Sequence, residues 1–244
     1  MVPTTESLAV VDRMLPNNHR DSAYLQYKNI VSTLATNRSL LEIGAGRRPL
    51  WTSTEIKQHN IDYVANDIVE RELDRIPFPV KKAVFDCCGD PPRMFLNSFD
   101  VICSKMVQEH VKSGDNFYRN IFRMLKPGAV AINFHPTLYC PPFLINRILP
   151  DNISSFILGL LTRERTEETR PKFPTTYELC YSSRRTAKLI KNIGFSKVSI
   201  FPFYHHEYFK SIPLLRIFDD AISTWAQTRD IRLLSSYAYT VVRK

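Results

Sequence analysis

The sequence lacks several features that would assign the chain to common protein classes. Its longest apolar run is far shorter than the roughly 20 residues that a membrane-spanning helix needs, so we expect no transmembrane segment. Residues 1–30 contain no charged segment followed by an apolar run, so we expect no secretory signal and predict a cytoplasmic protein. The five cysteines are odd in number and lack paired metal spacing, which predicts reduced thiols and no structural metal.

The most informative stretch is an apolar strand, Leu40 to Ile43, that ends in a glycine turn. Gly44 and Gly46 allow backbone angles and a close ligand approach that a side chain would block, and Pro49 suits the first turn of a following helix. Asp67 comes about twenty residues later, where a Rossmann-like fold places a carboxylate that binds ribose hydroxyls. The stretch therefore predicts a nucleotide-type cofactor site, although an ordinary strand-end acid is the alternative for Asp67.

The third glycine of the G-x-G-x-x-G dinucleotide motif is absent, because Pro49 stands at its position. Glu42 decides between the possible ligands. A carboxylate two residues before the turn would repel a pyrophosphate, whereas it would attract a ligand that carries an ammonium and a sulfonium. We therefore expect S-adenosylmethionine, with a buried carboxylate held by backbone amides as the alternative role for Glu42.

Residues 38 to about 136 resemble the class I S-adenosylmethionine-dependent methyltransferases, whose motifs occur here in the family's order. The matching segments are Leu40 to Gly46, Asp67, Val84 to Cys87, Phe99 to Ser104, Val107 to Val111, which is similar to L-E-H-V, and Leu125 to Ile132, which is similar to the L-x-P-G-G turn. The cofactor-binding residues that this resemblance implies are Glu42, Gly44, Ala45, Gly46, Asp67, Ile68, Asp86, Cys87 and Ser104. Asp86 is suited to accept a hydrogen bond from the adenine amino group, with a turn cap as its alternative role.

The resemblance also implies an α/β fold with a Rossmann-like seven-stranded sheet in the order 3-2-1-4-5-7-6, an antiparallel strand 7 and helices on both faces. Alternating strand and helix patterns agree with a single domain over residues 1–244. Its expected parts are an N-terminal helical lid (1–37), a cofactor-binding core (38–136) and two substrate-pocket insertions (137–182 and 204–234).

Helical spacing predicts two helices outside the matched segment. The first, Asp21 to Ala35, is a lid or packing helix, and the second runs from Ser182 or Ser183 to a stop at Gly194. The second helix is expected to turn four apolar side chains inward: Ala187, Leu189, Ile190 and Ile193. Strands are expected over Ser196 to Phe203 and Ser235 to Val242.

The methyl acceptor is indicated only by charge and by a looser resemblance. Residues 184–244 hold eleven Lys and Arg against four Asp and Glu, which suits an anionic lipid headgroup, a phosphorylated sugar carrier or a nucleic acid, unless the chain is simply basic. A nucleic acid is less favoured, because Ser104 to Val107 offer no Asn-Pro-Pro-Tyr-like amine clamp and no run of five basic residues occurs. The segment Pro136 to Leu161, followed by Lys172 to Pro174, resembles type 11 methyltransferases encoded with surface-glycan genes, which implies a sugar, glycolipid or other small-molecule acceptor. The basic surface beside the apolar residues of this segment predicts peripheral contact with the inner membrane face.

Methyl transfer to a hydroxyl needs a general base. His110, just after strand 4, is the first candidate and His135, at the end of strand 5, is the second. Their alternatives are packing beside Glu109 and loop structuring, respectively. His205 and His206 are candidates for the pocket lining, and without a third ligand nearby they predict no metal site. The overall alternative is a non-catalytic binding or regulatory protein with a methyltransferase fold.

Overall fold

The computed structural model describes residues 11, 13–14, 23–138, 174–207, 209 and 212–244. Most of the expected insertion 137–182 and the first part of the expected lid 1–37 lie outside the described residues. Among the described residues, no helix is long and apolar enough to cross a membrane.

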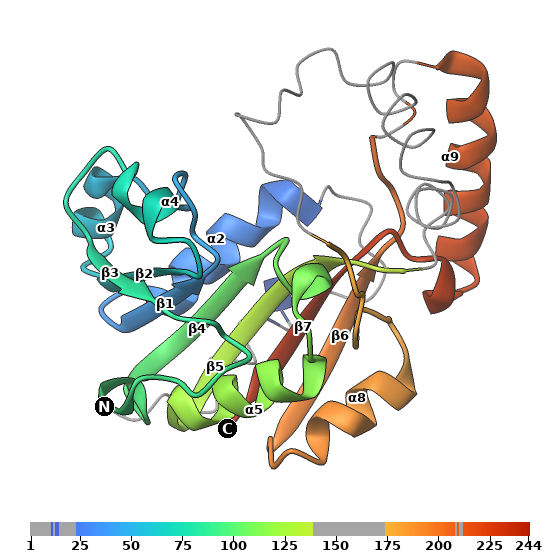
Figure 1. Cartoon of the computed structure of the whole chain (residues 1–244). Helices are drawn as coiled ribbons and strands as arrows, with labels where there is room; N and C mark the ends of the chain where they lie inside the picture. Colours follow the sequence, from blue (N-terminus) through green and yellow to red (C-terminus); the bar gives the residue numbers. More distant parts are fainter. Residues whose placement is uncertain (1–10, 12, 15–22, 139–173, 208, 210–211) are drawn as a thin grey trace.

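Seven strands form one sheet in the order β3-β2-β1-β4-β5-β7-β6 (Figure 1). Strand β7 runs antiparallel to both of its neighbours, and the other adjacent strands are parallel. The strands are β1 (Ser39–Ile43), β2 (Asp62–Asp67), β3 (Lys81–Val84), β4 (Phe99–Lys105), β5 (Leu125–Pro136), β6 (Lys197–Phe203) and β7 (Tyr237–Arg243). This topology confirms the predicted Rossmann-like methyltransferase fold.

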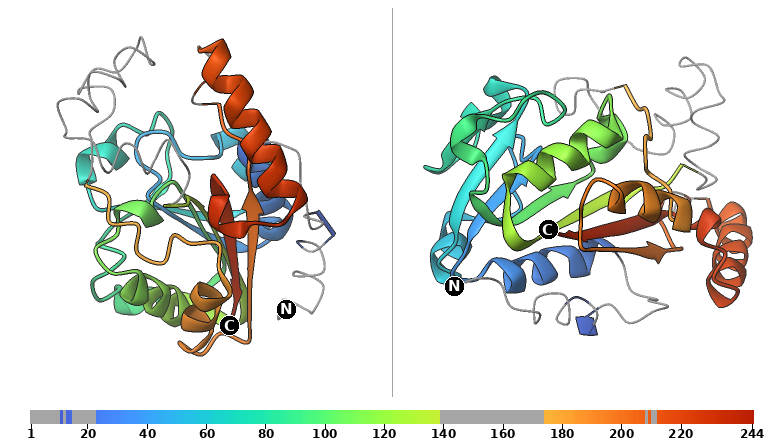
Figure 2. Two further views of the ribbon diagram at one scale, coloured as in Figure 1. Left: turned by 90° about the vertical axis from the view of Figure 1, so that its right-hand side faces the viewer. Right: turned by 90° about the horizontal axis from the view of Figure 1, so that it is seen from below.

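Helices cover both faces of the sheet, with α2 on one face and α5 and α8 on the other (Figure 2). The helices are α2 (Ala23–Ala35), α3 (Ser53–Gln58), α4 (Glu70–Asp74), α5 (Gly114–Met124), α8 (Arg184–Lys191) and α9 (Pro213–Thr228), and the single 3-10 turns are η1 (Arg93–Phe95), η2 (Gln108–His110) and η3 (Arg232–Leu234). Successive strand residues point to opposite faces, so Leu40 joins the hydrophobic cluster under α2 and Leu41 joins the cluster under α5.

Helix α2 packs on the sheet along its described length. Ile30, Val31 and Leu34 are buried in the core, as the helical spacing predicts. The buried Tyr27 hydroxyl lies 2.6 Å from the Ser104 carbonyl oxygen on β4 and 2.9 Å from that of Ile132 on β5, and it donates to this pair. Of the two expected roles, the structure therefore shows packing for this helix.

Two local expectations are wrong. Pro49 does not start a helix, because α3 begins after Thr52, whose hydroxyl accepts from the Glu55 amide while the Glu55 carboxylate accepts from the Thr52 amide. This capping box gives hydrogen-bond acceptors to two amides at the start of the helix, and a proline at that position could not provide them. Helix α8 starts after its N-cap Ser183 as predicted, but Leu189 is 47% exposed instead of facing inward.

Candidate functional site

The site lies at the edge where the parallel strands β1, β2 and β4 end. Ile43, the last residue of β1, is paired with Asn66 on one side and Ser104 on the other. The turn after β1 therefore sits between the carboxyl ends of β2 and β4. Ligands of open α/β sheets bind at this edge.

The glycine turn has the backbone that the sequence predicts. Gly44 and Gly46 have φ angles of +70° and +55°. A β-carbon at Gly44 would overlap the Cγ2 atom of Val107, whereas at Gly46 the nearest atom, Asp67 Oδ2, would be 3.8 Å away. The Ala45 amide donates to the Asn66 carbonyl at 2.8 Å, which ties the turn to β2. Gly44 is thus required by packing, and the space beside Gly46 is open.

Asp67 holds the same turn through its carboxylate. Its Oδ2 accepts from the Gly46 amide at 3.1 Å and its Oδ1 accepts from the Val69 amide at 2.9 Å. Since a carboxylate has about four acceptor positions, two of them remain for hydroxyl donors. The neighbouring Ile68 side chain is more than half exposed and offers an apolar surface.

Glu42 is buried beneath the turn. Its carboxylate accepts from the Leu50 amide and from the Tyr63 hydroxyl. Burial raises the pKa of Glu42 to about 7, although these two donors favour the ionised form. Glu42 is therefore a buried carboxylate held by a backbone amide, the alternative role expected for it, and this bond fixes the segment between the turn and α3.

An ion pair links the turn to α4, and sequence reasoning missed it. The Arg47 guanidinium donates to both oxygens of Glu72, each at 2.6 Å. No motif marks this pair, because its members lie on different elements. Asn66 is a second missed residue, and its buried side-chain amide donates to the carbonyls of Ala83 and Phe85 and fixes the end of β3.

The expected adenine side lies after β3. Asp86 Oδ1 accepts from the Cys88 amide at 2.8 Å, which is the turn-cap arrangement. The ligand atoms of Asp86, Cys87 and Cys88 lie within 4.8 Å of one another. Three consecutive donors fall short of the four ligands of a structural zinc site. The Cys88 Sγ donates to the Ser113 carbonyl, and a hydrogen bond from Cys87 lowers the pKa of the Cys88 thiol to about 7.

The acceptor side is formed by η2, directly after β4. His110 Nδ1 lies 3.0 Å from the Pro174 carbonyl oxygen, and its Nε2 lies 3.8 Å from Glu109 Oε1. Glu109 is buried, which raises its pKa to about 8. In the part of the chain that the structure describes, Glu109 Oε2 has no hydrogen-bond partner. The sequence offered Glu109 only as a packing neighbour, and the amides of the distant Thr176 and Tyr177 donate to its backbone carbonyl oxygen.

Two other predicted residues lie inside the sheet. His135 is fully buried, with Nε2 2.9 Å from Thr240 Oγ1, and burial lowers its pKa to about 4. Strand β5 continues to Pro136 and pairs His135 with Ala238, so this side chain does not reach the acceptor side as expected. The hydroxyl of Ser104 is also buried and donates to Asn133 Oδ1 at 2.8 Å.

A hollow of about 400 Å³ lies at the opposite edge of the sheet, where β1 and β2 begin. Its lining includes Ser39, Asp62, Asp100 and Lys126. Lys126 pairs with Asp100 at 2.7 Å. The amino edge of a parallel sheet is not where such folds bind ligands, so the candidate site remains at the carboxyl edge.

Comparisons with known proteins agree with this architecture. A family model described as a methyltransferase domain matches residues 10–200. No curated protein sequence matches the chain.

Solved structures give the same result at low sequence identity. An S-adenosylmethionine-dependent methyltransferase from Mesorhizobium loti is 13% identical, with a TM-score of 0.52 over 91% of this chain and 98% of that chain. An S-adenosylmethionine-dependent methyltransferase from Archaeoglobus fulgidus is 14% identical, with a TM-score of 0.53 over 91% and 100%. Phosphoethanolamine N-methyltransferase 2 from Haemonchus contortus, in complex with S-adenosyl-L-methionine, is 17% identical, with a TM-score of 0.52 over 99% of this chain and 57% of that chain. At these identities the likeness shows the fold alone.

The two glycines provide a matched test of the turn. Gly44→Ala should lower the free energy of unfolding by roughly 1–2 kcal/mol for the positive φ angle and by roughly 1–3 kcal/mol more for the overlap with Val107. Gly46→Ala should cause only the loss of roughly 1–2 kcal/mol from the positive φ angle. Urea unfolding measures both losses. A Val107→Ala change in the Gly44→Ala background should recover the second amount in a double-mutant cycle. Equal losses for the two glycine variants would contradict the close approach.

Glu42 should make stability depend on pH. Its pKa is raised from 4.5 to about 7 in the folded chain, so its contribution is full below pH 4.5 and is lost as the pH rises through 7. The loss is up to about 3 kcal/mol. Glu42→Gln should reduce the slope of the unfolding free energy across this window, and the remaining slope is that of Glu109, whose pKa is raised to about 8. Glu55→Gln is the control, since the pKa of Glu55 is lowered to about 2 and its contribution is constant above pH 4.5. The same slope in Glu42→Gln and wild type would contradict the assignment.

Proposed function

The chain belongs to the methyltransferase domain family, and on this premise we propose that it transfers the methyl group of S-adenosylmethionine to a hydroxyl of a sugar, glycolipid or other small molecule. The observation that carries the proposal is the hydrogen bond from the Gly46 amide to the Asp67 carboxylate, which lies at the carboxyl ends of β1 and β2. It places an open backbone turn beside an acid with remaining acceptor positions.

The residues at this edge fit S-adenosylmethionine. Asp67 would bind the ribose hydroxyls, while the exposed Ile68 side chain, Asp86 and the Cys87 amide would contact adenine. Glu42 would attract the cationic methionine part from beneath the turn. Ser104 would support the site as the buried end of β4, since its hydroxyl is already bound to Asn133.

When bound, the cofactor supplies a methyl group on a sulfonium, so the protein must position the acceptor and remove its proton. We assign the proton transfer to His110. The Pro174 carbonyl orders the ring because Nδ1–H donates to it, which leaves Nε2 as the basic nitrogen. His110 is partly exposed at the carboxyl edge, whereas His135 is sealed inside the sheet.

Glu109 would position His110 and stabilise its charge. The pKa of Glu109 is about 8, so the carboxyl group is mostly protonated near neutral pH and does not hold His110 as a permanent cation. Once His110 Nε2 takes the hydroxyl proton, the imidazolium would lower the pKa of Glu109, and the ionised carboxylate 3.8 Å away would then stabilise the imidazolium.

Calorimetry with S-adenosylmethionine and with S-adenosylhomocysteine tests the cofactor assignment. Asp67→Asn should weaken both affinities at least about tenfold, because one charge-assisted hydrogen-bond acceptor is lost. Asp74→Asn is a matched control, since this acid at the end of α4 is exposed and pairs with Lys82 at 2.9 Å. Failure of the wild-type chain to bind either ligand would overturn the proposal.

Turnover measurements test the base. With saturating cofactor and a panel of sugar and glycolipid hydroxyls, His110→Gln should lower the rate of S-adenosylhomocysteine formation by roughly 10²–10⁴-fold. Cofactor affinity should stay within about threefold, because His110 does not bind the cofactor in this proposal. His59→Gln, at the C-cap of α3, is the control histidine. Full activity of His110→Gln would place the base elsewhere, and cofactor binding without turnover of any acceptor would favour the non-catalytic alternative.

A further inference from the structure

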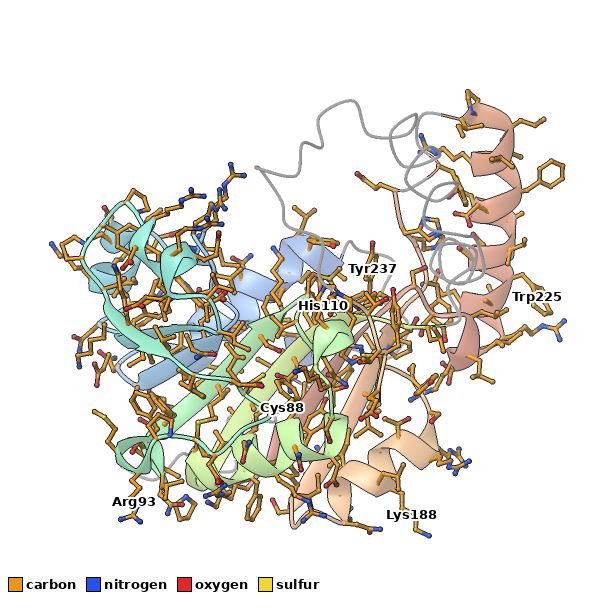
Figure 3. The ribbon with its side chains drawn as sticks, viewed as in Figure 1. Cys88, Arg93, His110, Lys188, Trp225 and Tyr237 are labelled. Carbon is orange, nitrogen blue, oxygen red and sulfur yellow. The ribbon has the colours of Figure 1, made fainter. Side chains whose placement is uncertain are left out.

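Helix α9 is packed with its polar side inward. Its buried residues are Asp219, Ser223, Ala226 and Gln227. Its large apolar residues are 47% to 68% exposed, and they are Leu214, Leu215, Ile217, Phe218, Ile222 and Trp225. Figure 3 shows Trp225 pointing away from the body of the protein. This is the reverse of the usual arrangement, in which a surface helix turns its apolar stripe to the core.

The two sides of the helix are sharply separated. At roughly 100° per residue, the six exposed apolar side chains fall within about 160° of the helix circumference, and the buried polar residues occupy the opposite side. We call the six residues the α9 apolar face. Contiguous apolar surface of this kind marks an interaction site rather than ordinary exposure of single residues.

Specific contacts fix the helix in this orientation. His205 Nε2 lies 3.1 Å from Gln227 Oε1, and His206 Nε2 lies 3.2 Å from Asp219 Oδ1. Both histidines directly follow β6, so the polar side of α9 is anchored to the end of that strand. Turning the α9 apolar face inward would break both contacts.

We propose that the α9 apolar face docks the protein on an anionic lipid bilayer. An amphipathic helix with Trp, Phe and Leu on one side lies in the interfacial plane of a membrane with its apolar side in the acyl boundary. The whole chain carries a net charge of +9, to which α9 itself contributes one Arg and two Asp. An anionic surface attracts this charge, whereas a second copy of the chain is repelled by it.

The location of the face relates it to the candidate site. Strands β5 and β6 both pair antiparallel with β7, so β6 runs parallel to β5 and ends at the same edge as the glycine turn. Helix α9 follows that end (Figure 1). A membrane under α9 would therefore present a lipid-anchored acceptor on the acceptor side of the sheet. This last step rests on the proposed function, while the docking itself does not.

Vesicle binding tests the proposal with the full chain. Vesicles of phosphatidylcholine with about 30% phosphatidylserine should co-sediment with the protein, binding to pure phosphatidylcholine should be at least about tenfold weaker, and added salt should reduce the difference. The chain has two tryptophans, and Trp51 is buried, so a blue shift of the fluorescence on binding would report Trp225.

Substitutions locate the contact. Ile217→Ser with Phe218→Ser should weaken vesicle binding at least about tenfold, since two apolar anchors are lost. Met94→Ser with Leu189→Ser is the matched control, because these apolar side chains are also exposed but lie on η1 and α8. Cofactor affinity by calorimetry should be the same in both double variants, so a failure of docking is distinguishable from a failure of the proposed function.

Three results would overturn the proposal. The first is that the wild-type chain does not bind anionic vesicles, and the second is that the two double variants lose binding equally. The third is that light scattering shows a dimer, which the Ile217→Ser with Phe218→Ser double variant dissociates. The last result would assign the α9 apolar face to a second copy of the chain.

Discussion

Two carboxylates hold the turn after β1 from opposite sides, and the candidate site depends on them. Glu42 lies within β1 and accepts from the Leu50 amide beyond the turn, while Asp67 at the end of β2 accepts from the Gly46 amide within it. Together they fix a backbone that contains two positive φ angles. Such a backbone persists only where its surroundings hold it, and here polar contacts supply that support. The protein's own polar contacts therefore order the turn, so its shape does not have to be created when a ligand binds.

The sheet and the turn were predictable because their signals are local. Apolar runs, an acid at a strand end and a glycine pair each occur within a few residues, and the strand order followed from the resemblance. His135 shows where this reasoning stops. Its side chain is buried within the sheet, where β5 pairs with β7. The residue paired with His135 is Ala238, which is more than a hundred positions away in the chain. The Pro49 expectation failed for a different reason, since a stronger helix start follows at Thr52.

Sequence reasoning expected only a pocket insertion over residues 204–234, so it missed helix α9 as well as its orientation, and it also missed the burial of Glu109. A periodic apolar pattern shows that a helix has two sides but does not say which side meets the core. For α9 that choice is made by His205 and His206, which bind its polar side. Similarly, the amides of Thr176 and Tyr177 bind the Glu109 carbonyl oxygen, and burial of the Glu109 side chain raises its pKa. Non-local contacts therefore decide the chemistry of both features, whereas local patterns decide only where the elements form.

A carboxyl group with a pKa of about 7 also means that the charge beneath the glycine turn is not constant under physiological conditions. Near neutral pH, Glu42 is ionised in only about half of the molecules. A cation that settles beside it would favour the ionised form, and the proton released would pass to the buffer. Ligand capture at this edge would thus be coupled to proton release. The enthalpy observed in a calorimeter would then vary with the ionisation heat of the buffer.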